Sequence, residues 1–260
     1  MPMKKTMLGL AVILLIGVSL TISGCEVVTG SGEIITLEMD YRDFERIEVT
    51  YAFEVEIEQS ETYQVQIIID EALLEYLQVK KSGGTVYIGL KSGNTYMDQV
   101  RKAEIKLPRL RRLELSGASG GTVSGFSTVN DMRFELSGAS SLDVINLKAR
   151  DIDIEASGAS EFAGNVEIRA GEFKLSGGST LKLAGSASDI SLEASGASDA
   201  HLADFTTASA DIELSGASDA EVVVNERLEI NLSGASKLIY YGNPRLGSIN
   251  VSGGSSIVQK

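Results

Sequence analysis

Short runs of alternating apolar and polar residues recur along the chain, and in the C-terminal half each run ends at the same small-residue unit. The unit reads Ser-Gly-Ala-Ser or Ser-Gly-Gly-Ser, and successive copies are 18 to 21 residues apart. A period near 19 residues that tolerates small changes in length is typical of a solenoid, in which each repeat forms one coil. The eight first serines are Ser116, Ser137, Ser157, Ser176, Ser195, Ser215, Ser233 and Ser252.

The repeats predict which side chains point inward. The residues one and three positions before each first serine are apolar, as in Leu113 and Leu115, and the residue between them is mostly acidic, as in Glu114. Side chains two apart in a strand share a face, so the apolar columns should lie inside and the acidic column should face water. A second inward run follows each corner, beginning at Leu142, Phe162, Leu181, Ala200, Ala220, Leu238 and Ile257.

Stacking these coils predicts an all-β fold, a right-handed parallel β-helix of about eight short coils. Equivalent strands in such a stack lie in parallel register about 4.8 Å apart, and parallel crossovers are overwhelmingly right-handed. Glycine and serine suit the corners, because glycine reaches backbone angles closed to other residues and serine hydroxyls bond nearby backbone groups. A two-layer sandwich would not need identical corners at a fixed period.

The remaining sequence divides into three parts before the repeat region, residues 111–260. Residues 33–110 alternate like strands without repeating, for example at 53–58, and we expect them to form an N-terminal β segment that caps the solenoid. Residues 25–32 are predicted to be a Gly/Ser-containing tether. Residues 1–24 read as an export signal.

The export signal carries a further prediction about anchoring. Lys4 and Lys5 precede an apolar run from Met7 to Leu20, which is too short for a comfortable membrane span. The following Ile22-Ser23-Gly24-Cys25 resembles the lipobox of bacterial lipoproteins, in which the cysteine becomes the lipidated first residue. Cys25 is also the only cysteine in the chain. The resemblance implies an exported protein held by lipid at Cys25 on the periplasmic or cell-surface face of a membrane; an uncleaved signal anchor and a plain secretory signal are the alternatives.

The charge balance limits the partners. The chain has 23 basic and 36 acidic residues and a net charge of −13. Loss of residues 1–24 would remove two lysines and no acids, which makes the charge −15. Nucleic-acid binding needs a cationic face and is therefore not expected. Direct adsorption to anionic lipid is equally disfavoured, so acyl chains would have to hold the protein at the membrane.

Several segments resemble one bacterial family. The lead-in at residues 43–49, the following strand at 53–57, the Leu-Ser-Gly-Ala-Ser coils, and the C-terminal segments at 233–244 and 251–255 are all similar to the "putative auto-transporter adhesin head GIN domain" family, formerly a domain of unknown function. The likeness covers roughly residues 30–258. It implies an exported β-helical domain, often on lipoproteins, with an adhesin-like role and no catalytic residues. Tyr51-Ala52 departs from the small residue or glycine that relatives usually carry.

Catalysis is not expected. A serine nucleophile needs a base, and the only histidine, His201, is predicted to point outward in a column with Asp143, Lys182 and Glu221. The corner serines occur in eight copies, which indicates a structural role. A polysaccharide-cleaving β-helix enzyme remains an alternative, although the aspartates do not gather in one interrupted coil.

The candidate binding face consists of stacked carboxylates and two aromatic residues. Adjacent carboxylates repel one another, and a hard cation such as Ca²⁺ would relieve that repulsion; a solvated face that discourages aggregation is the alternative. A second outward column holds Glu161, Asp199 and Asp219. Tyr240 and Tyr241 could stack on sugars or cover the end of the core, and covering the core is favoured. The candidate ligand or cation face is therefore Glu114, Glu135, Glu155, Glu193, Glu213, Tyr240 and Tyr241.

A basic run, Arg101 to Arg112, stands out in this acidic chain. It could bind an anionic glycan or another chain, but pairing with nearby acids and closing the first coil is favoured. Together these observations predict a non-enzymatic, lipid-anchored, adhesin-like module of the cell envelope, whose partner is a glycan or an envelope protein. A structural or sensory envelope component is the alternative.

Overall fold

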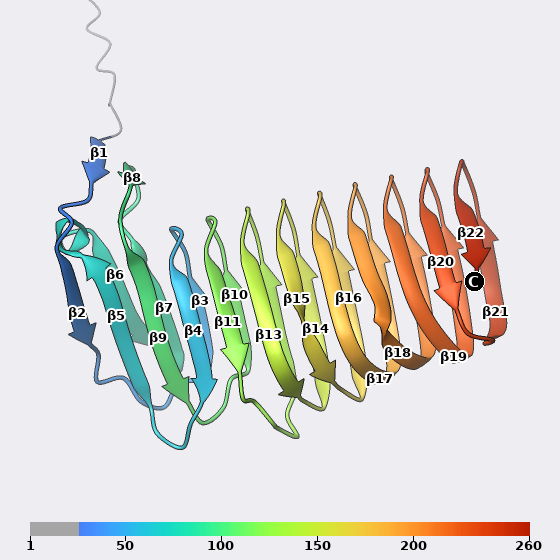
Figure 1. Cartoon of the computed structure of the whole chain (residues 1–260), viewed down its shortest axis with the longest axis horizontal. Coiled ribbons are helices and arrows are strands. Elements are labelled where there is room, and N and C mark those ends of the chain that lie inside the picture. Colours follow the sequence, from blue (N-terminus) through green and yellow to red (C-terminus); the bar gives the residue numbers. More distant parts are fainter. Residues whose placement is uncertain (1–25) are drawn as a thin grey trace, which may run out of the picture.

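The computed structural model describes residues 26–260, which form an elongated all-β solenoid of about seven turns (Figure 1). This confirms the predicted parallel β-helix. Two parallel sheets make its long sides. The first sheet holds the strands that precede the serine corners of the repeats, together with two N-terminal strands that continue it. The repeat strands are β10 (Arg112–Leu115), β12 (Met132–Leu136), β14 (Asp151–Ala156), β16 (Ala170–Leu175) and β21 (Arg245–Val251), and the N-terminal strands are β7 (Thr85–Leu90) and β3 (Arg46–Val49).

The second sheet holds the strands that follow the serine corners, together with two N-terminal strands that continue it. The repeat strands are β11 (Gly120–Ser124), β13 (Ser141–Lys148), β15 (Glu161–Glu167), β20 (Lys237–Tyr241) and β22 (Ser256–Gln259), and the N-terminal strands are β9 (Arg101–Leu107) and β4 (Glu54–Gln59). Three long strands bend from the second sheet into the first: β17 (Thr180–Ala194), β18 (Asp199–Leu214) and β19 (Asp219–Leu232).

The inward columns form one continuous core, as the repeat predicts. Leu113, Phe134 and Ile212 are fully buried, and apolar side chains from every coil join them in a single cluster. The last coil differs. Ile249 and Val251 occupy the inward positions but remain 45% and 47% exposed, because β21 is the outermost strand of the first sheet and only one side of it is packed.

The corners are built from backbone contacts between coils. Gly177 has a φ of +77°, and a Cβ there would lie 2.6 Å from the carbonyl oxygen of Gly158. The next residue, Gly178, donates its N–H to that same oxygen at 2.7 Å. Inside the corner, Ser179 is fully buried and its hydroxyl donates to the Ser176 carbonyl at 2.7 Å. The same internal hydroxyl-to-carbonyl bond recurs at most corners, as in Ser160 and Ser198, although Ser218 Oγ is buried without a partner.

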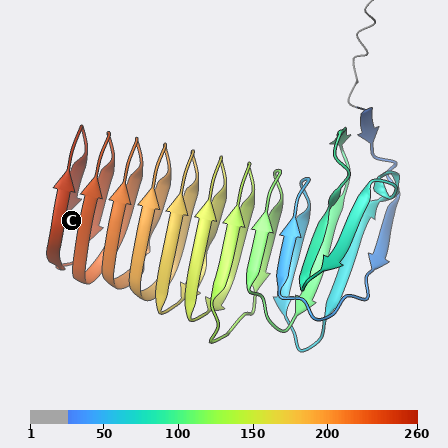
Figure 2. The ribbon, with the colours of Figure 1, turned by 180° about the vertical axis from the view of Figure 1, so that it is seen from behind.

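The N-terminal region continues the two sheets in a different order from the sequence (Figures 1 and 2). Strands β3 and β4 lie directly against the first repeat coil, and the later strands β7 and β9 lie outside them. Beyond these, pairing becomes antiparallel: β6 (Leu77–Ser82) pairs with β7, β5 (Gln64–Asp70) with β9, and β2 (Ile34–Glu38) with β5. These antiparallel strands cover the N-terminal end of the core.

The described part of the predicted tether is also held to this cap. Strand β1 (Glu26–Thr29) pairs with β8 (Asn94–Met97). Asp70, buried where β5 meets the short 3-10 turn η1 (Glu71–Leu73), accepts hydrogen bonds from Ser31 N and Oγ at 2.9 and 2.7 Å, from Ala72 N at 3.0 Å and from Gly32 N at 3.1 Å. These bonds, chiefly those from Ser31, lower the pKa of Asp70 to about 2.

Residues 1–25 lie outside the described part of the chain, so the signal and Cys25 have no structural account here. Among residues 26–260, no helix has the length and apolar character needed to cross a membrane.

Candidate functional site

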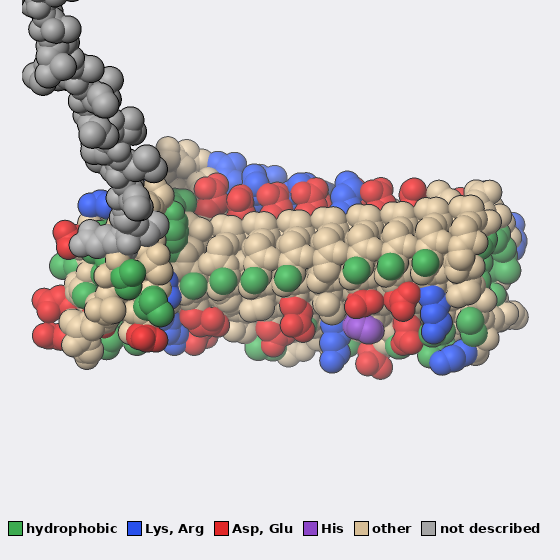
Figure 3. Space-filling model, turned by 90° about the horizontal axis from the view of Figure 1, so that it is seen from above, with side chains coloured by type: hydrophobic (Ala, Val, Ile, Leu, Met, Phe, Trp, Pro, Cys, Tyr) green, Lys and Arg blue, Asp and Glu red, His purple; other side chains and the backbone are tan. Residues whose placement is uncertain are grey.

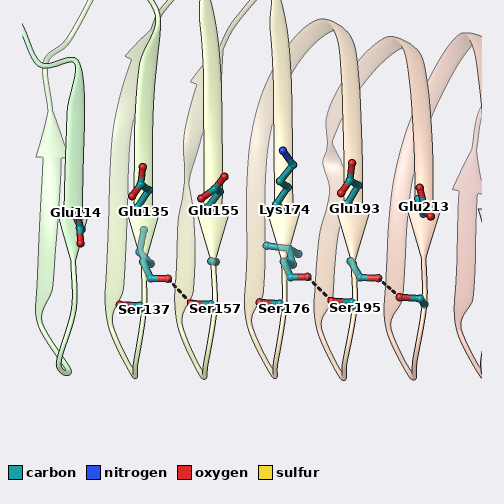
Figure 4. Close-up of a pocket in the computed structure, with 15 residues that line it drawn as sticks. Glu114, Glu135, Ser137, Glu155, Ser157, Lys174, Ser176, Glu193, Ser195 and Glu213 are labelled. Carbon is teal, nitrogen blue, oxygen red and sulfur yellow. Dashed lines mark hydrogen bonds between the residues drawn. The ribbon is translucent and has the colours of Figure 1, made fainter.

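A shallow groove of ≈ 430 Å³ runs along the first sheet beside the serine corners. We name it the carboxylate groove. Figure 3 shows the mostly acidic row that borders the ridge of corners, and Figure 4 shows its side chains, with Lys174 among the glutamates, and four of the corner serines. Its polar lining consists of Glu114, Glu135, Glu155, Lys174, Glu193 and Glu213 together with Ser137, Ser157, Ser176, Ser195 and Ser215.

Strand register sets the order of charges along the groove. Glu114 lies opposite Glu135, and Glu135 opposite Glu155. Lys174 then separates Glu155 from Glu193, and the row ends with Glu213 before Asn231. The sequence columns therefore correspond to a real row of neighbours on one face.

Arginines from the adjacent outward column neutralise the first half of the row. Arg112 Nη2 lies 2.6 Å from Glu135 Oε2 and 3.1 Å from Glu114 Oε2. Arg133 pairs with Glu135 and Asp153, and its Nη2 lies 2.8 Å from Glu155 Oε1. Arg133 is not among the residues predicted from the sequence, although its place two residues before a row glutamate, like that of Arg112, was the available signal.

This pairing gives neighbouring carboxyl groups different proton affinities. Burial would raise the pKa of Glu135, but hydrogen bonds from Arg133 and Arg112 outweigh it and lower the pKa. At Glu114 burial prevails over the attraction of Arg112 and raises the pKa, and the charges of Glu48 and Glu135 add to the increase.

The second half of the row is less compensated. Lys174 pairs with Glu172 beside it. Within residues 26–260, neither Glu193 nor Glu213 forms an ion pair. This end of the groove therefore presents carboxylate oxygens that are free to accept hydrogen bonds from a ligand.

The first serines of the corners supply hydroxyl groups along the groove (Figure 4). Ser157 Oγ and Ser195 Oγ each donate to a carbonyl of the preceding coil at 3.4 Å, and Ser215 Oγ does so at 3.5 Å. Hydrogen bonds this long are weak. These hydroxyls can therefore turn toward a ligand at little cost.

The two candidate tyrosines do not join the groove. Tyr240 is only 5% exposed, and its hydroxyl donates to Gln259 Oε1 at 3.1 Å. Its ring covers the core near the last coil, so Tyr240 is corrected from a ligand-facing residue to a core residue. Tyr241 is partly exposed, and the Lys260 ammonium lies 6.0 Å from its ring centre.

The remaining candidate chemistry lies elsewhere. His201 is exposed on the second sheet, in register with Lys182 and Glu221. Within the described residues, no group of three or more histidine, cysteine or acidic side chains is placed to hold a metal ion. Arginines relieve the repulsion in the first half of the row, at Glu114, Glu135 and Glu155.

Comparison with known proteins agrees with this architecture. The family model described as "Putative auto-transporter adhesin, head GIN domain" matches residues 43–244. No curated protein matches the chain.

Solved structures share the fold at low sequence identity. A protein from Parabacteroides distasonis, titled a putative lipid binding protein, aligns with a TM-score of 0.84 at 20% identity, covering 90% of this chain and 100% of that one. A putative adhesin from Parabacteroides merdae aligns with a TM-score of 0.84 at 17% identity, covering 91% and 100%. A putative adhesin from Bacteroides fragilis aligns with a TM-score of 0.70 at 16% identity, covering 90% and 100%. With the family model spanning most of the solenoid, this chain belongs to the putative auto-transporter adhesin head GIN domain family.

Proposed function

We propose that this protein is a non-enzymatic binding module of the cell envelope, anchored by lipid at Cys25, whose carboxylate groove holds an extended ligand. The observation that carries the proposal is the repetition of one charged side chain, a carboxylate on every coil except that of Lys174, and one serine hydroxyl over several successive coils. A repeated lining suits a repeated ligand. It does not suit one reacting atom, which needs convergent groups with tuned proton affinities.

The chemistry of the lining favours a glycan with hydroxyl or amine groups. Carboxylate oxygens accept hydrogen bonds from such donors, and bonds to charged groups are stronger than neutral ones. The unpaired end of the groove, at Glu193 and Glu213, would contribute most. A basic segment of an envelope protein is the other occupant that this lining would accept.

The matched test uses two triple variants that remove the same charge from different faces. Glu155→Gln/Glu193→Gln/Glu213→Gln alters the groove, and Glu161→Gln/Asp199→Asn/Asp219→Asn alters the second sheet. Full-length protein in neutral detergent is applied to an array of neutral and amino-sugar oligosaccharides. We expect the groove variant to lose about tenfold in affinity and the control to bind like the wild type. Equal binding by the wild type, the groove variant and the control variant would reject the carboxylate groove as the binding site.

Two further measurements test the remaining parts of the proposal. Mass spectrometry of the mature N-terminus should find an acylated Cys25, and Cys25→Ser should leave the protein unprocessed or without its lipid while the fold is unchanged. An unmodified N-terminus elsewhere would reject lipid anchoring. Cleavage of a polysaccharide or an ester that one point mutation abolishes, without unfolding, would reject the non-enzymatic reading.

A further inference from the structure

A second hollow, of ≈ 640 Å³, lies where the first sheet begins near the N-terminal end. Its lining is unusual for a chain of net charge −13. Two acidic residues, Asp43 and Glu45, contribute to it, together with Tyr63 and the Gly83–Gly84 turn. We name it the arginine groove after its five guanidinium groups, from Arg46, Arg109, Arg111, Arg112 and Arg133.

Two of these arginines have few partners for their guanidinium N–H donors. Arg109 and Arg111 share one carboxylate, that of Glu45, at 2.8 and 4.0 Å. Their side chains are 63% and 68% exposed. Since each guanidinium carries five N–H donors, most of their donors face water. Arg112 and Arg133 differ, because Glu135 and its neighbours in the carboxylate groove already engage them.

The backbone around Arg46 is fixed by the fold. The Gly84 carbonyl accepts the N–H groups of Glu45 and Arg46 at 3.1 and 3.2 Å, so the β6–β7 turn is tied to the start of β3. Arg46 Nε donates to Thr85 Oγ1 at 3.0 Å. The Gly83–Gly84 turn has no side chains to fill the opening beside Arg46. The groove therefore has a defined wall and an open mouth.

We propose that the arginine groove binds the carboxylate or sulfate groups of an acidic glycan. A planar guanidinium offers two parallel donors that match the oxygens of such groups. The groove is concave and flanked by the acidic row. The carboxylates of that row would repel a broad anionic surface such as a membrane or a nucleic acid. A single anionic substituent on a narrow chain can enter. This site is separate from the carboxylate groove and does not depend on the function proposed for it.

The test compares two double variants that remove the same charge. Arg109→Gln/Arg111→Gln alters the groove, and Arg227→Gln/Arg245→Gln removes two arginines near the other end of the solenoid. Binding of full-length protein in neutral detergent is measured by calorimetry with dextran sulfate, polygalacturonate, neutral dextran, inorganic sulfate and vesicles containing phosphatidylglycerol. We expect the wild type to bind the two acidic polysaccharides, the groove variant to bind at least about tenfold more weakly, and the control to change less than about twofold. Binding should weaken as salt is raised.

A variant that should bind the polysaccharides more tightly distinguishes a specific effect from a loss of binding caused by misfolding. Glu45→Gln removes the carboxylate that competes for Arg109 and Arg111, so it should tighten polysaccharide binding several-fold. The proposal is overturned by absence of binding to both acidic polysaccharides, by equal losses in the two double variants, by weaker binding of Glu45→Gln, or by binding of the vesicles or inorganic sulfate alone.

Discussion

The corner of the N-terminal coil and the corners of the repeat coils perform the same turn with different residues. Thr50-Tyr51-Ala52-Phe53 joins β3 to β4 in the place where each repeat has Ser-Gly-Ala-Ser or Ser-Gly-Gly-Ser. Tyr51 and Ala52 have φ values of 65° and 54°, so residues with side chains adopt left-handed backbone here. In the repeats glycine takes the first of these positions.

The difference shows that stacking, as well as backbone angle, requires the glycines. A Cβ on Gly158, Gly196 or Gly234 would lie 2.4 to 2.5 Å from the carbonyl oxygen of the preceding corner glycine. Tyr51 belongs to the first corner in the stack, because its outer neighbour β7 ends without such a turn. A side chain is therefore tolerated in the first corner and excluded from the corners from Gly158 onward, whereas a Cβ on Gly117 or Gly138 would be tight, at 3.1 and 3.3 Å from its nearest neighbour.

The backbone hydrogen bonds between successive corners also change direction along the stack. Ala52 N donates forward to the Gly117 carbonyl at 3.0 Å, whereas Ala159 N donates backward to the Gly138 carbonyl at 2.7 Å. In the first repeat coil Gly117 and Ala118 both have positive φ, as in the N-terminal corner, but from Gly138 onward only the glycine does. The first repeat coil thus keeps the corner geometry of the N-terminal coil.

The largest expected effect is on the core that both regions share. Ile212→Asp places an unpaired charge at a fully buried position in β18, which should destabilise the fold by more than about 4 kcal/mol. Ile212→Val, measured in the same thermal and urea melts, should cost only about 1 kcal/mol. Similar melting of the aspartate variant and the wild type would show that the inward register is wrong.

The next effect distinguishes Gly177, which the stacking of the corners requires, from Gly178, which alanine can replace. Gly177→Ala should destabilise the fold by about 2–3 kcal/mol, because the left-handed backbone costs ~1–2 kcal/mol and the corner must also shift. Gly178→Ala is the matched control. Its Cβ would meet nothing closer than 3.9 Å, and the other Ser-Gly-Ala-Ser corners already have alanine there. The control should be neutral or slightly stabilising in urea titrations.

A smaller effect belongs to the cap alone. Asp70→Ala removes the acceptor of four hydrogen bonds and should lower the melting temperature, with faster hydrogen exchange at Ser31 and Gly32. The folded pKa of about 2 lies below the ordinary value of 3.8, so the stabilisation is full above pH 4 and lost progressively as pH falls below 3.8. The difference in melting temperature between wild type and variant should therefore shrink as pH falls below 3.8 and be largely lost only below pH 2. A constant difference would assign the effect to packing.

The smallest effect concerns the unpaired end of the carboxylate groove. Glu213→Ala removes repulsion with Glu193 and should raise stability by about 0.2–0.5 kcal/mol at low salt. Higher salt should reduce this gain, because exposed charges are screened. In contrast, Glu135→Ala should destabilise the fold, since it leaves Arg112 and Arg133 without a shared partner. Melts of both variants at two salt concentrations would show whether the two halves of the row differ as the ion pairs indicate.

The sequence by itself determined the solenoid, the inward and outward columns and the corner chemistry. Identical spacing in successive repeats fixes a parallel register, so Glu135 must neighbour Glu155 and Leu136 must neighbour Ala156. The family resemblance was visible for the same reason. Because the repeats are alike, the position of a residue in one coil predicts the position of its equivalent in the next coil.

Only the tertiary structure decided what repetition does not encode. The strands of residues 33–110 have no common period, so nothing in the sequence indicates that β7 and β9 stack outside β3 and β4. The ion pairs of Arg133 depend on how long side chains cross between two columns, and the burial of Tyr240 depends on the neighbouring coil that covers it. Contacts between residues distant in sequence depend on packing and backbone geometry, which a pattern of residue types specifies only where it repeats.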